Sequence, residues 1–119
     1  MVEVDHRIKK DEIIAIADFR KQHGLLPAII QEEGTGNILI LGYMNEEALK
    51  RTLQEKRVYF YSRARQKVAM KGEESGNVLE VTGVNLDCDN DTLLVTVVLN
   101  GICACHTGTR SCFNHEVEI

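Results

Sequence analysis

Three cysteines and a histidine lie within ten residues near the end of the chain. They are Cys103, Cys105, His106 and Cys112, and a fourth cysteine, Cys88, precedes them. Zn²⁺ takes four nitrogen or sulfur ligands in structural sites, but three protein ligands and a water in catalytic sites. The spacing lacks the paired C-x-x-C hooks of zinc ribbons. We therefore predict a transition-metal site with three protein ligands and an open position, which would yield hydroxide at neutral pH.

The residue types also allow simpler interpretations. His106 is close enough in sequence to transfer protons at such a site, but it could instead be a zinc ligand or a hydrogen-bonded loop histidine. Cys103 could be a small buried apolar side chain. Because no secretory signal is visible at the N-terminus, we expect thiols or metal ligands rather than disulfides.

Asp87, Asp89 and Asp91 alternate along an acidic turn that we expect to join the strands over residues 78–86 and 93–99, and that also contains Cys88. In extended backbone, this spacing places the three carboxylates on one side and the cysteine on the other. Clustered carboxylates repel one another unless a cation neutralises them, and an all-oxygen ligand set suits Mg²⁺ or Ca²⁺. The alternative is an ordinary acidic hairpin turn, in which Asp and Asn are favoured.

The charge of the chain is distributed unevenly. The net charge is −4, and residues 87–119 account for all of it. Residues 50–71, in contrast, carry eight basic side chains against a single acidic one, Glu55. A polyanionic ligand would suit this basic segment, although a solvated basic surface is the simpler alternative.

A glycine-rich turn over residues 72–77 follows the basic segment. Its backbone N–H groups and the Ser75 hydroxyl could hold a phosphate group beside Arg63, Arg65 and Lys71. A plain hairpin turn is the alternative for these residues.

Hydrophobic periodicity predicts an α+β fold, with a β-rich core of about six strands and two helices. We expect one helix over residues 11–23, begun by Asp11 and ended by Gly24, and a second over residues 46–56, capped by Asn45. The expected strands span residues 28–31, 38–43, 58–62, 63–71, 78–86 and 93–99. A loop over residues 101–113 is expected to carry the cysteine chemistry.

Length and composition limit the classes of protein to be considered. The chain has 119 residues, of which 44% are hydrophobic, and we expect a single domain over residues 1–119. No stretch approaches ~18 apolar residues, and no targeting signal is visible, so we expect a cytoplasmic protein without membrane contact. The absence of Trp and the presence of only six aromatic residues argue against a stacking surface for nucleic acid.

Several segments of the chain resemble a known family. The most specific are residues 86–91, LDCDND, and residues 104–113, ACHTGTRSCF, and residues 41–48, 61–65 and 71–77 add to them. Together they resemble the phosphoribosyl-AMP cyclohydrolase family, whose enzymes open a purine ring in histidine biosynthesis. The resemblance extends over residues 26–113.

The resemblance implies a zinc site shared between two chains. Cys88, Cys105 and Cys112 match the zinc ligands of the family, and one of the three would come from the neighbouring chain of an intertwined homodimer. Cys103 matches no ligand.

The resemblance also implies the remaining parts of an active site. Asp87, Asp89 and Asp91 match the magnesium ligands of the family, and His106 matches a histidine implicated in proton transfer. The family usually carries a Trp at the position of Ala69 and an aromatic residue at the position of Asn114.

The implied reaction is the hydrolytic opening of the N1–C6 bond of phosphoribosyl-AMP. This substrate carries two phosphomonoesters, and their charge of about −4 suits the basic segment. We expect the phosphates to be held by Arg63, Arg65, Lys71 and Ser75. The alternatives are a non-catalytic zinc-binding paralogue and a cyclohydrolase for a different phosphorylated purine.

Overall fold

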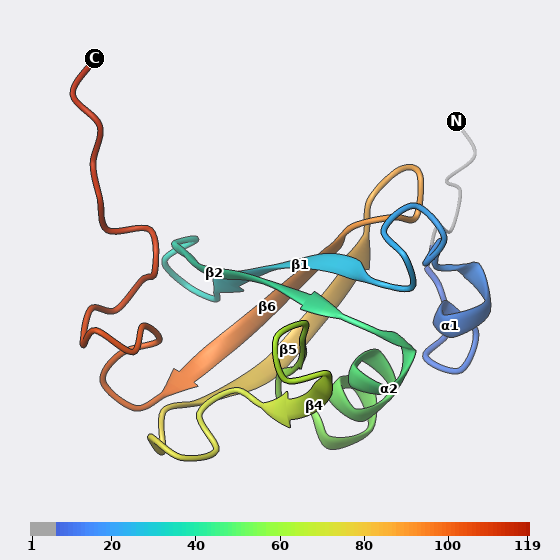
Figure 1. The fold of residues 1–119 in the computed structure, drawn as a ribbon, viewed down its shortest axis with the longest axis horizontal. Helices are drawn as coiled ribbons and strands as arrows, with labels where there is room; N and C mark the ends of the chain where they lie inside the picture. The colour runs from blue at the N-terminus through green and yellow to red at the C-terminus, as the bar shows by residue number, and fades with distance from the viewer. Residues whose placement is uncertain (1–6) are drawn as a thin grey trace.

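The computed structural model describes residues 7–119 (Figure 1). Its strands are β1 (Leu26–Glu32), β2 (Ile38–Met44), β3 (Tyr59–Ser62), β4 (Lys67–Met70), β5 (Val78–Leu86) and β6 (Leu93–Asn100). Its helices are α1 (Ile13–Ile16) and α2 (Glu46–Glu55). The predicted α+β fold with six strands and two helices is therefore confirmed in this part of the chain. Neither helix has the length and apolar run that a membrane span requires.

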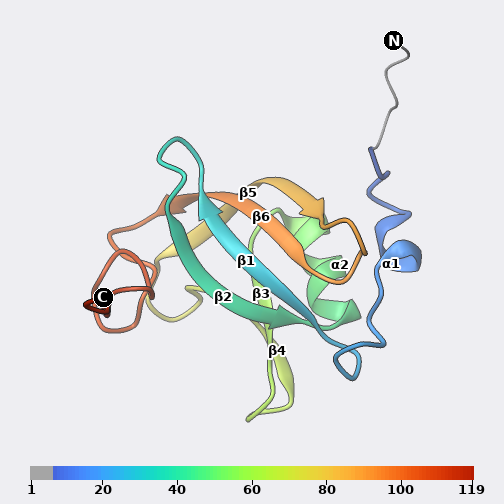
Figure 2. The same ribbon diagram turned by 90° about the horizontal axis from the view of Figure 1, so that it is seen from above.

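Four strands form the main sheet, in the order β2-β1-β6-β5, and β3 and β4 form a separate hairpin. The two central strands, β1 and β6, run parallel, whereas β2 and β5 pair antiparallel with their neighbours. Figure 2 shows α2 and the β3–β4 hairpin on one side of this sheet. The order leaves β2 and β5 as the edge strands.

The core lies between one face of the main sheet and α2. Alternate side chains of β1 and β6 are buried, as expected for strands that present one face to a core. Helix α2 contributes Ala48, Leu49 and Thr52 to the core. The buried Thr52 hydroxyl donates to the Ala48 carbonyl at 2.8 Å and accepts from the Tyr59 amide at 3.0 Å. No buried polar atom is thus left without a partner at this contact.

Helix α2 forms where the sequence predicts it. The Asn45 side chain accepts a hydrogen bond from the Ala48 amide at 2.8 Å, and Glu46 and Glu47 occupy the first turn. Such a cap and acidic first turn stabilise a helix N-terminus. The helix ends one residue before the predicted end, because Lys56 adopts a left-handed conformation with φ of 56°.

The predicted helix over residues 11–23 is wrong in both extent and cap. Only Ile13–Ile16 are helical, and Glu12 occupies the N-cap position without a side-chain hydrogen bond. Ala17 is already extended, and the Asp18 amide donates to the Asn90 carbonyl at 2.7 Å. This contact with the β5–β6 turn replaces the next helical bond. Because β-branched isoleucines have only modest helix propensity, one tertiary hydrogen bond can end the helix early.

The predicted strand over residues 63–71 is also shorter than expected. Residues 63–66 form the turn of the β3–β4 hairpin, and Gln66 adopts a positive φ of 51°. The Ser62 hydroxyl accepts a hydrogen bond from the Arg65 amide at 3.2 Å, which closes this turn. Arg63 and Arg65 therefore lie in a turn rather than on a strand.

Candidate active site

The loop after β6 folds back on itself around Cys105. The Ala104 amide donates to the Arg110 carbonyl at 3.0 Å, and the Cys105 amide donates to the Thr109 carbonyl at 3.1 Å. Gly108 closes the bend by donating to the Cys105 carbonyl at 3.0 Å, with a φ of 93° that favours glycine. The predicted loop over residues 101–113 is confirmed, and its two arms bring Cys105 and Cys112 close enough together for each sulfur to shift the pKa of the other.

This loop is tied to the edge strand β2. The Cys112 amide donates to the Leu39 carbonyl at 2.7 Å, and the Ser111 hydroxyl donates to the Ile38 carbonyl at 2.6 Å. Both bonds fix the backbone next to the Cys112 side chain. The position of Cys112 is thus set by the main sheet.

An ion pair between the half-exposed Arg110 and a buried carboxylate anchors the same loop to β1. The Arg110 guanidinium donates to the Glu32 carboxylate, which is only 5% exposed and also accepts from the Thr35 hydroxyl at 2.9 Å. Arg110 holds the pKa of Glu32 below its usual range. Sequence reasoning missed this pair, because the two residues are 78 positions apart and neither has a local pattern that points to the other.

The loop also contacts the glycine-rich turn through Asn77. The Asn77 side-chain oxygen accepts from the Ile102 amide at 3.0 Å, and its side-chain nitrogen lies 3.7 Å from the Cys103 sulfur. Gly101 adopts a φ of 148°, and a side chain there would collide with Asn77. The turn over residues 72–77 and the cysteine loop are therefore packed directly against each other.

The hydrogen bonds around Cys105 favour its thiolate. The Thr107 hydroxyl lies 3.0 Å from the Cys105 sulfur. This hydroxyl, followed by the Thr107 amide and the Thr109 hydroxyl, lowers the pKa of Cys105 to about 6. Desolvation, together with the neighbouring Cys105 sulfur, raises the pKa of Cys112. Of the two neighbouring cysteines, Cys105 is thus the one that favours the thiolate at neutral pH.

Alkylation of the metal-free protein should reveal this difference. We expect the rate at which iodoacetamide modifies Cys105 to increase with pH, with a midpoint at pH about 6, because the thiolate is the reacting form. Thr107→Val should move this midpoint upward by roughly one pH unit, since it removes the largest stabilising hydrogen bond. Peptide mapping by mass spectrometry separates Cys105 from the other cysteines. A Cys105 midpoint near 9 in the unmodified sequence would contradict the assignment.

A cavity of about 560 Å³ lies between the β3–β4 hairpin, the glycine-rich turn and the cysteine loop. Its lining includes five of the predicted site residues, Arg65, Lys71, Ser75, Cys105 and His106, and also Cys103. The basic residues and the sulfur chemistry therefore meet in one cavity, although they are far apart in the chain. Ala69 also lines the cavity, so its small side chain leaves room there.

Arg63 lies apart from these residues. Its guanidinium is stacked on the Tyr43 ring, 4.4 Å from the ring centroid. It lines a neighbouring depression of about 490 Å³, to which Lys71 also contributes. Lys71 thus borders both hollows, and Arg63 borders only the outer one.

The three aspartates gather in the β5–β6 turn. Ligand oxygens of Asp87, Asp89 and Asp91 lie within 4.8 Å of one another. The predicted acidic turn and its carboxylate cluster are confirmed, but the extended backbone that we used to place the carboxylates on one side and Cys88 on the other is wrong. The segment is a tight turn in which Asn90 adopts a φ of 60° and the Asp87 carboxylate accepts the Asp91 amide at 3.0 Å. The turn brings the carboxylates closer together than extended backbone could, because Asp87 and Asp91 would be ~13 Å apart along an extended strand.

Two contacts of the acidic turn were not predicted. The Lys21 ammonium lies 2.9 Å from the Asp91 carboxylate and 3.5 Å from that of Asp89, and it holds the pKa of Asp91 low. The Cys88 sulfur donates to the Asp89 carboxylate at 3.1 Å instead of facing away from it, and this raises the pKa of the thiol. Sequence spacing cannot reveal Lys21, because it reaches the turn from the segment after α1.

Cys88 is separated from the other two predicted zinc ligands. It lies in the turn before β6, whereas Cys105 and Cys112 follow β6, at the opposite end of the sheet (Figure 1). Eight residues of strand span ~26 Å. Within residues 7–119, the acidic turn is the one group of three metal-type side chains that a single chain gathers. The three cysteines do not meet in one chain.

Comparison with known proteins shows the family of this chain. The sequence model described as phosphoribosyl-AMP cyclohydrolase matches residues 40–114. The chain belongs to this family. The match includes the acidic turn, the basic hairpin and the cysteine loop, which are the segments that form the cavity and the carboxylate cluster.

Individual members of the phosphoribosyl-AMP cyclohydrolase family are about half identical to this chain. The phosphoribosyl-AMP cyclohydrolase of Geobacter sp. (strain M21) is 50% identical over 101 residues, which are 85% of this chain and 81% of the relative. The histidine biosynthesis bifunctional protein HisIE of Photobacterium profundum is 49% identical over 106 residues, 89% of this chain and 51% of the relative. HisIE of Staphylococcus aureus (strain COL) is 51% identical over 100 residues, 84% of this chain and 46% of the relative. The chain spans about half the length of these bifunctional relatives.

Proposed function

We propose that this chain catalyses the hydrolytic opening of the N1–C6 bond of phosphoribosyl-AMP, as a zinc- and magnesium-dependent enzyme of histidine biosynthesis. One observation carries the proposal: basic side chains, a histidine and a low-pKa cysteine line a single cavity. The name of the Geobacter relative, similar over most of both chains, supports the same substrate.

The cysteine loop suits zinc by the chemistry of its donors. Cys105 favours the thiolate form, and the Cys112 sulfur lies beside it. Thiolates are preferred zinc ligands. Because β6 separates Cys88 from this pair, a site with all three sulfurs requires Cys88 from a second chain. We therefore propose a homodimer with a shared zinc site.

The acidic turn suits magnesium. Its carboxylate oxygens are hard donors within 4.8 Å of one another, and Mg²⁺ binds one or two carboxylates together with substrate phosphates. We propose Asp87, Asp89 and Asp91 as its ligands. Lys21 partly neutralises the same carboxylates, so binding of the cation would weaken the Lys21 contact.

The residues of the cavity then have separate tasks. When bound, zinc supplies a water nucleophile at neutral pH and magnesium supplies positive charge to phosphate oxygens. His106, exposed at the cavity, would accept a proton from the attacking water and deliver a proton to N1 as the N1–C6 bond breaks. Arg65, Lys71 and Ser75 would hold phosphate, and Arg63 would extend this surface from the outer depression.

Arg65→Ala and Lys71→Ala should each raise KM for phosphoribosyl-AMP by about tenfold or more, with a smaller change in kcat. Each variant removes a charge-assisted hydrogen bond to phosphate. Arg63→Ala should raise KM less, because Tyr43 holds that guanidinium outside the cavity. Steady-state kinetics on the purified variants measures these effects. Lys50→Ala on α2, where Lys50 pairs with Glu46, is the matched control, and an unchanged KM in Arg65→Ala would remove that residue from the site.

The direct test is to incubate the protein with phosphoribosyl-AMP, Zn²⁺ and Mg²⁺ and to follow the absorbance of the imidazole carboxamide product. Turnover that requires the protein supports the proposal. Absence of turnover in a zinc-loaded sample would contradict it and would favour a second candidate, a cyclohydrolase for a different phosphorylated purine. Ala69 on the cavity wall favours that candidate. The family usually has a Trp at this position, and a Trp could stack on the base of the substrate, whereas Ala69 cannot.

A further inference from the structure

The last five residues, His115 to Ile119, extend away from the rest of the molecule (Figure 1). Val117 is 77% exposed, and no hydrogen bond or ion pair joins residues 115–119 to the remainder of residues 7–119. Glu116, Val117, Glu118 and Ile119 alternate acidic and apolar side chains. Such alternation is typical of a strand with one polar and one apolar face. The segment, here called the tail, lies beyond the match to the family model.

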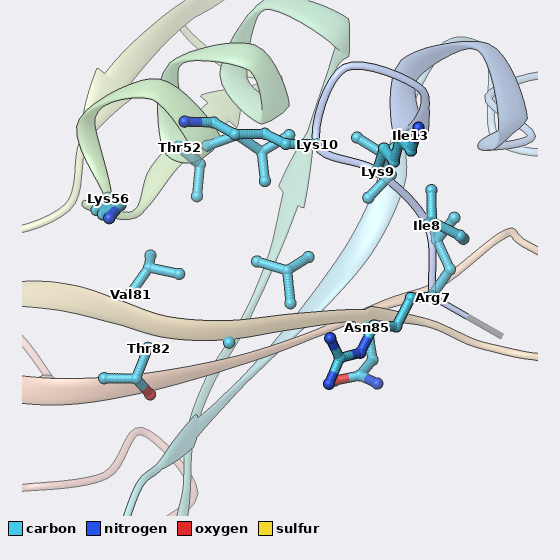
Figure 3. A pocket seen from close by; sticks show the side chains of 14 residues that line it. Arg7, Ile8, Lys9, Lys10, Ile13, Thr52, Lys56, Val81, Thr82 and Asn85 are labelled. Carbon is cyan, nitrogen blue, oxygen red and sulfur yellow. The ribbon is translucent and has the colours of Figure 1, made fainter. Parts of the chain in front are cut away.

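A groove of about 680 Å³ follows the outer edge of β5 (Figure 3). The first part of this edge is paired, because the Val81 amide donates to the Lys56 carbonyl at 2.9 Å and Arg57 bridges to Glu80. From Thr82 to Leu86, β6 is the one strand paired with β5 among the described residues. This five-residue edge lines the groove. An unpaired edge beside a groove is the geometry to which an added strand binds.

The charge of the groove complements that of the tail. Lys9, Lys10 and Lys56 line the groove, and no described carboxylate lies within ion-pair distance of them. No acidic residue is among the described lining residues. In Figure 3, β5 forms the floor, and α2 and the segment from Arg7 to Lys10 face it from the other side. Leu53 and Val84 add apolar surface for the other face of a strand.

We propose that the tail of a second copy of this chain adds to the Thr82–Leu86 edge of β5 as an antiparallel strand. Glu116 and Glu118 then face the lysines of the groove, and Val117 and Ile119 contact its apolar lining. The tail of the same chain starts from the opposite edge of the main sheet. It leaves the body at β2, across the sheet from β5.

The direction of the added strand rests on the proposed function. If one zinc ion joins Cys88 of one copy to Cys112 of the other, the tail of the second copy begins beside the end of β5 in the first. Cys88 follows Leu86 by two residues, and the tail follows Cys112 by three. The tail then runs away from the metal, while β5 runs toward it. This opposite sense is what antiparallel pairing requires.

Photo-crosslinking tests the location. Benzoylphenylalanine replaces Val117 in a ¹⁵N-labelled full chain, which is mixed with an unlabelled chain that lacks the photoprobe and is irradiated. We expect crosslinks between a labelled tail and unlabelled residues 82–86 or 7–10, in a band of dimer size. Crosslinks to these residues within one labelled chain, or crosslinks to any other surface, would overturn the proposal. The same probe at Ile102, which is also exposed, is the matched control and should not mark β5.

Charge reversal tests the contribution to association. Glu116→Lys with Glu118→Lys should raise the dimer dissociation constant, measured by sedimentation, about tenfold or more, and Lys9→Glu with Lys10→Glu in the same chain should restore it. Glu33→Lys with Glu47→Lys changes the net charge equally and should have no such effect. An unchanged constant in the tail variant overturns the inference. The proposed function is kept if the unmodified chain dimerises, binds zinc and hydrolyses phosphoribosyl-AMP, even when the tail variant shows no effect. If the unmodified chain does none of these, both the proposed function and the tail inference are contradicted.

Discussion

Cys105→Ala is expected to lose bound zinc and turnover together. Cys105 is the buried, low-pKa sulfur of the cavity, so its removal takes away the thiolate that is already ionised at neutral pH. Loss of a metal that supplies several kcal/mol of transition-state stabilisation corresponds to a decrease in kcat/KM of about 1,000-fold or more. Metal analysis of the purified protein and steady-state assays measure the two losses.

Cys103→Ala is the matched control for this experiment. Cys103 lies in the same loop and lines the same cavity, but its sulfur contacts the Asn77 side chain rather than the other cysteines. We expect zinc content close to that of the unmodified protein. Zinc loss in Cys103→Ala together with zinc retention in Cys105→Ala would reverse the two roles and would contradict the proposed ligand set.

Mixing two inactive variants should restore activity. Cys88→Ala retains the Cys105–Cys112 pair, and Cys105→Ala retains Cys88. In a two-fold dimer with shared sites, a heterodimer of these variants contains one complete site and one site without either ligand. Random exchange makes half of the dimers heterodimers, so the mixture should reach about a quarter of the unmodified activity. The measurement is the assay of each variant alone and after subunit exchange.

The geometry of one chain motivates this expectation. A single chain separates Cys88 from Cys112 by the whole length of β6, and no local rearrangement of either loop covers that distance. Cys105→Ala mixed with Cys112→Ala is the control, because neither partner then offers an intact pair and no activity should return. A mixture of Cys88→Ala and Cys105→Ala that stays inactive although exchange is complete would contradict the shared site.

Periodicity and caps in the sequence were sufficient for most of the fold. The alternation in β5, the apolar run in β6 and the Asn45 cap each depend on neighbours in the sequence, and these elements form as predicted. Helix α1 does not extend as predicted, because Asp18 bonds to Asn90, a residue 72 positions later. Local patterns carry no information about such a partner.

The candidate site shows the same limit. The aspartate cluster and the contact between Cys105 and Cys112 lie within short segments, so spacing was enough to anticipate them. The Arg110–Glu32 pair and the approach of Lys21 to Asp91 join distant segments and left no trace in the sequence pattern. The location of Arg63 on Tyr43 likewise depends on how the β3–β4 hairpin lies against β2.

One amide side chain, that of Asn77, touches two segments with different tasks in the proposed reaction. Its own backbone belongs to the turn proposed to hold phosphate, and its side chain holds the Ile102 amide at the start of the cysteine loop. Order in one segment therefore favours order in the other, by a coupling that must be equal in both directions. If the turn holds phosphate and the loop holds the metal, as proposed, a change at Asn77 is expected to alter the affinity for both.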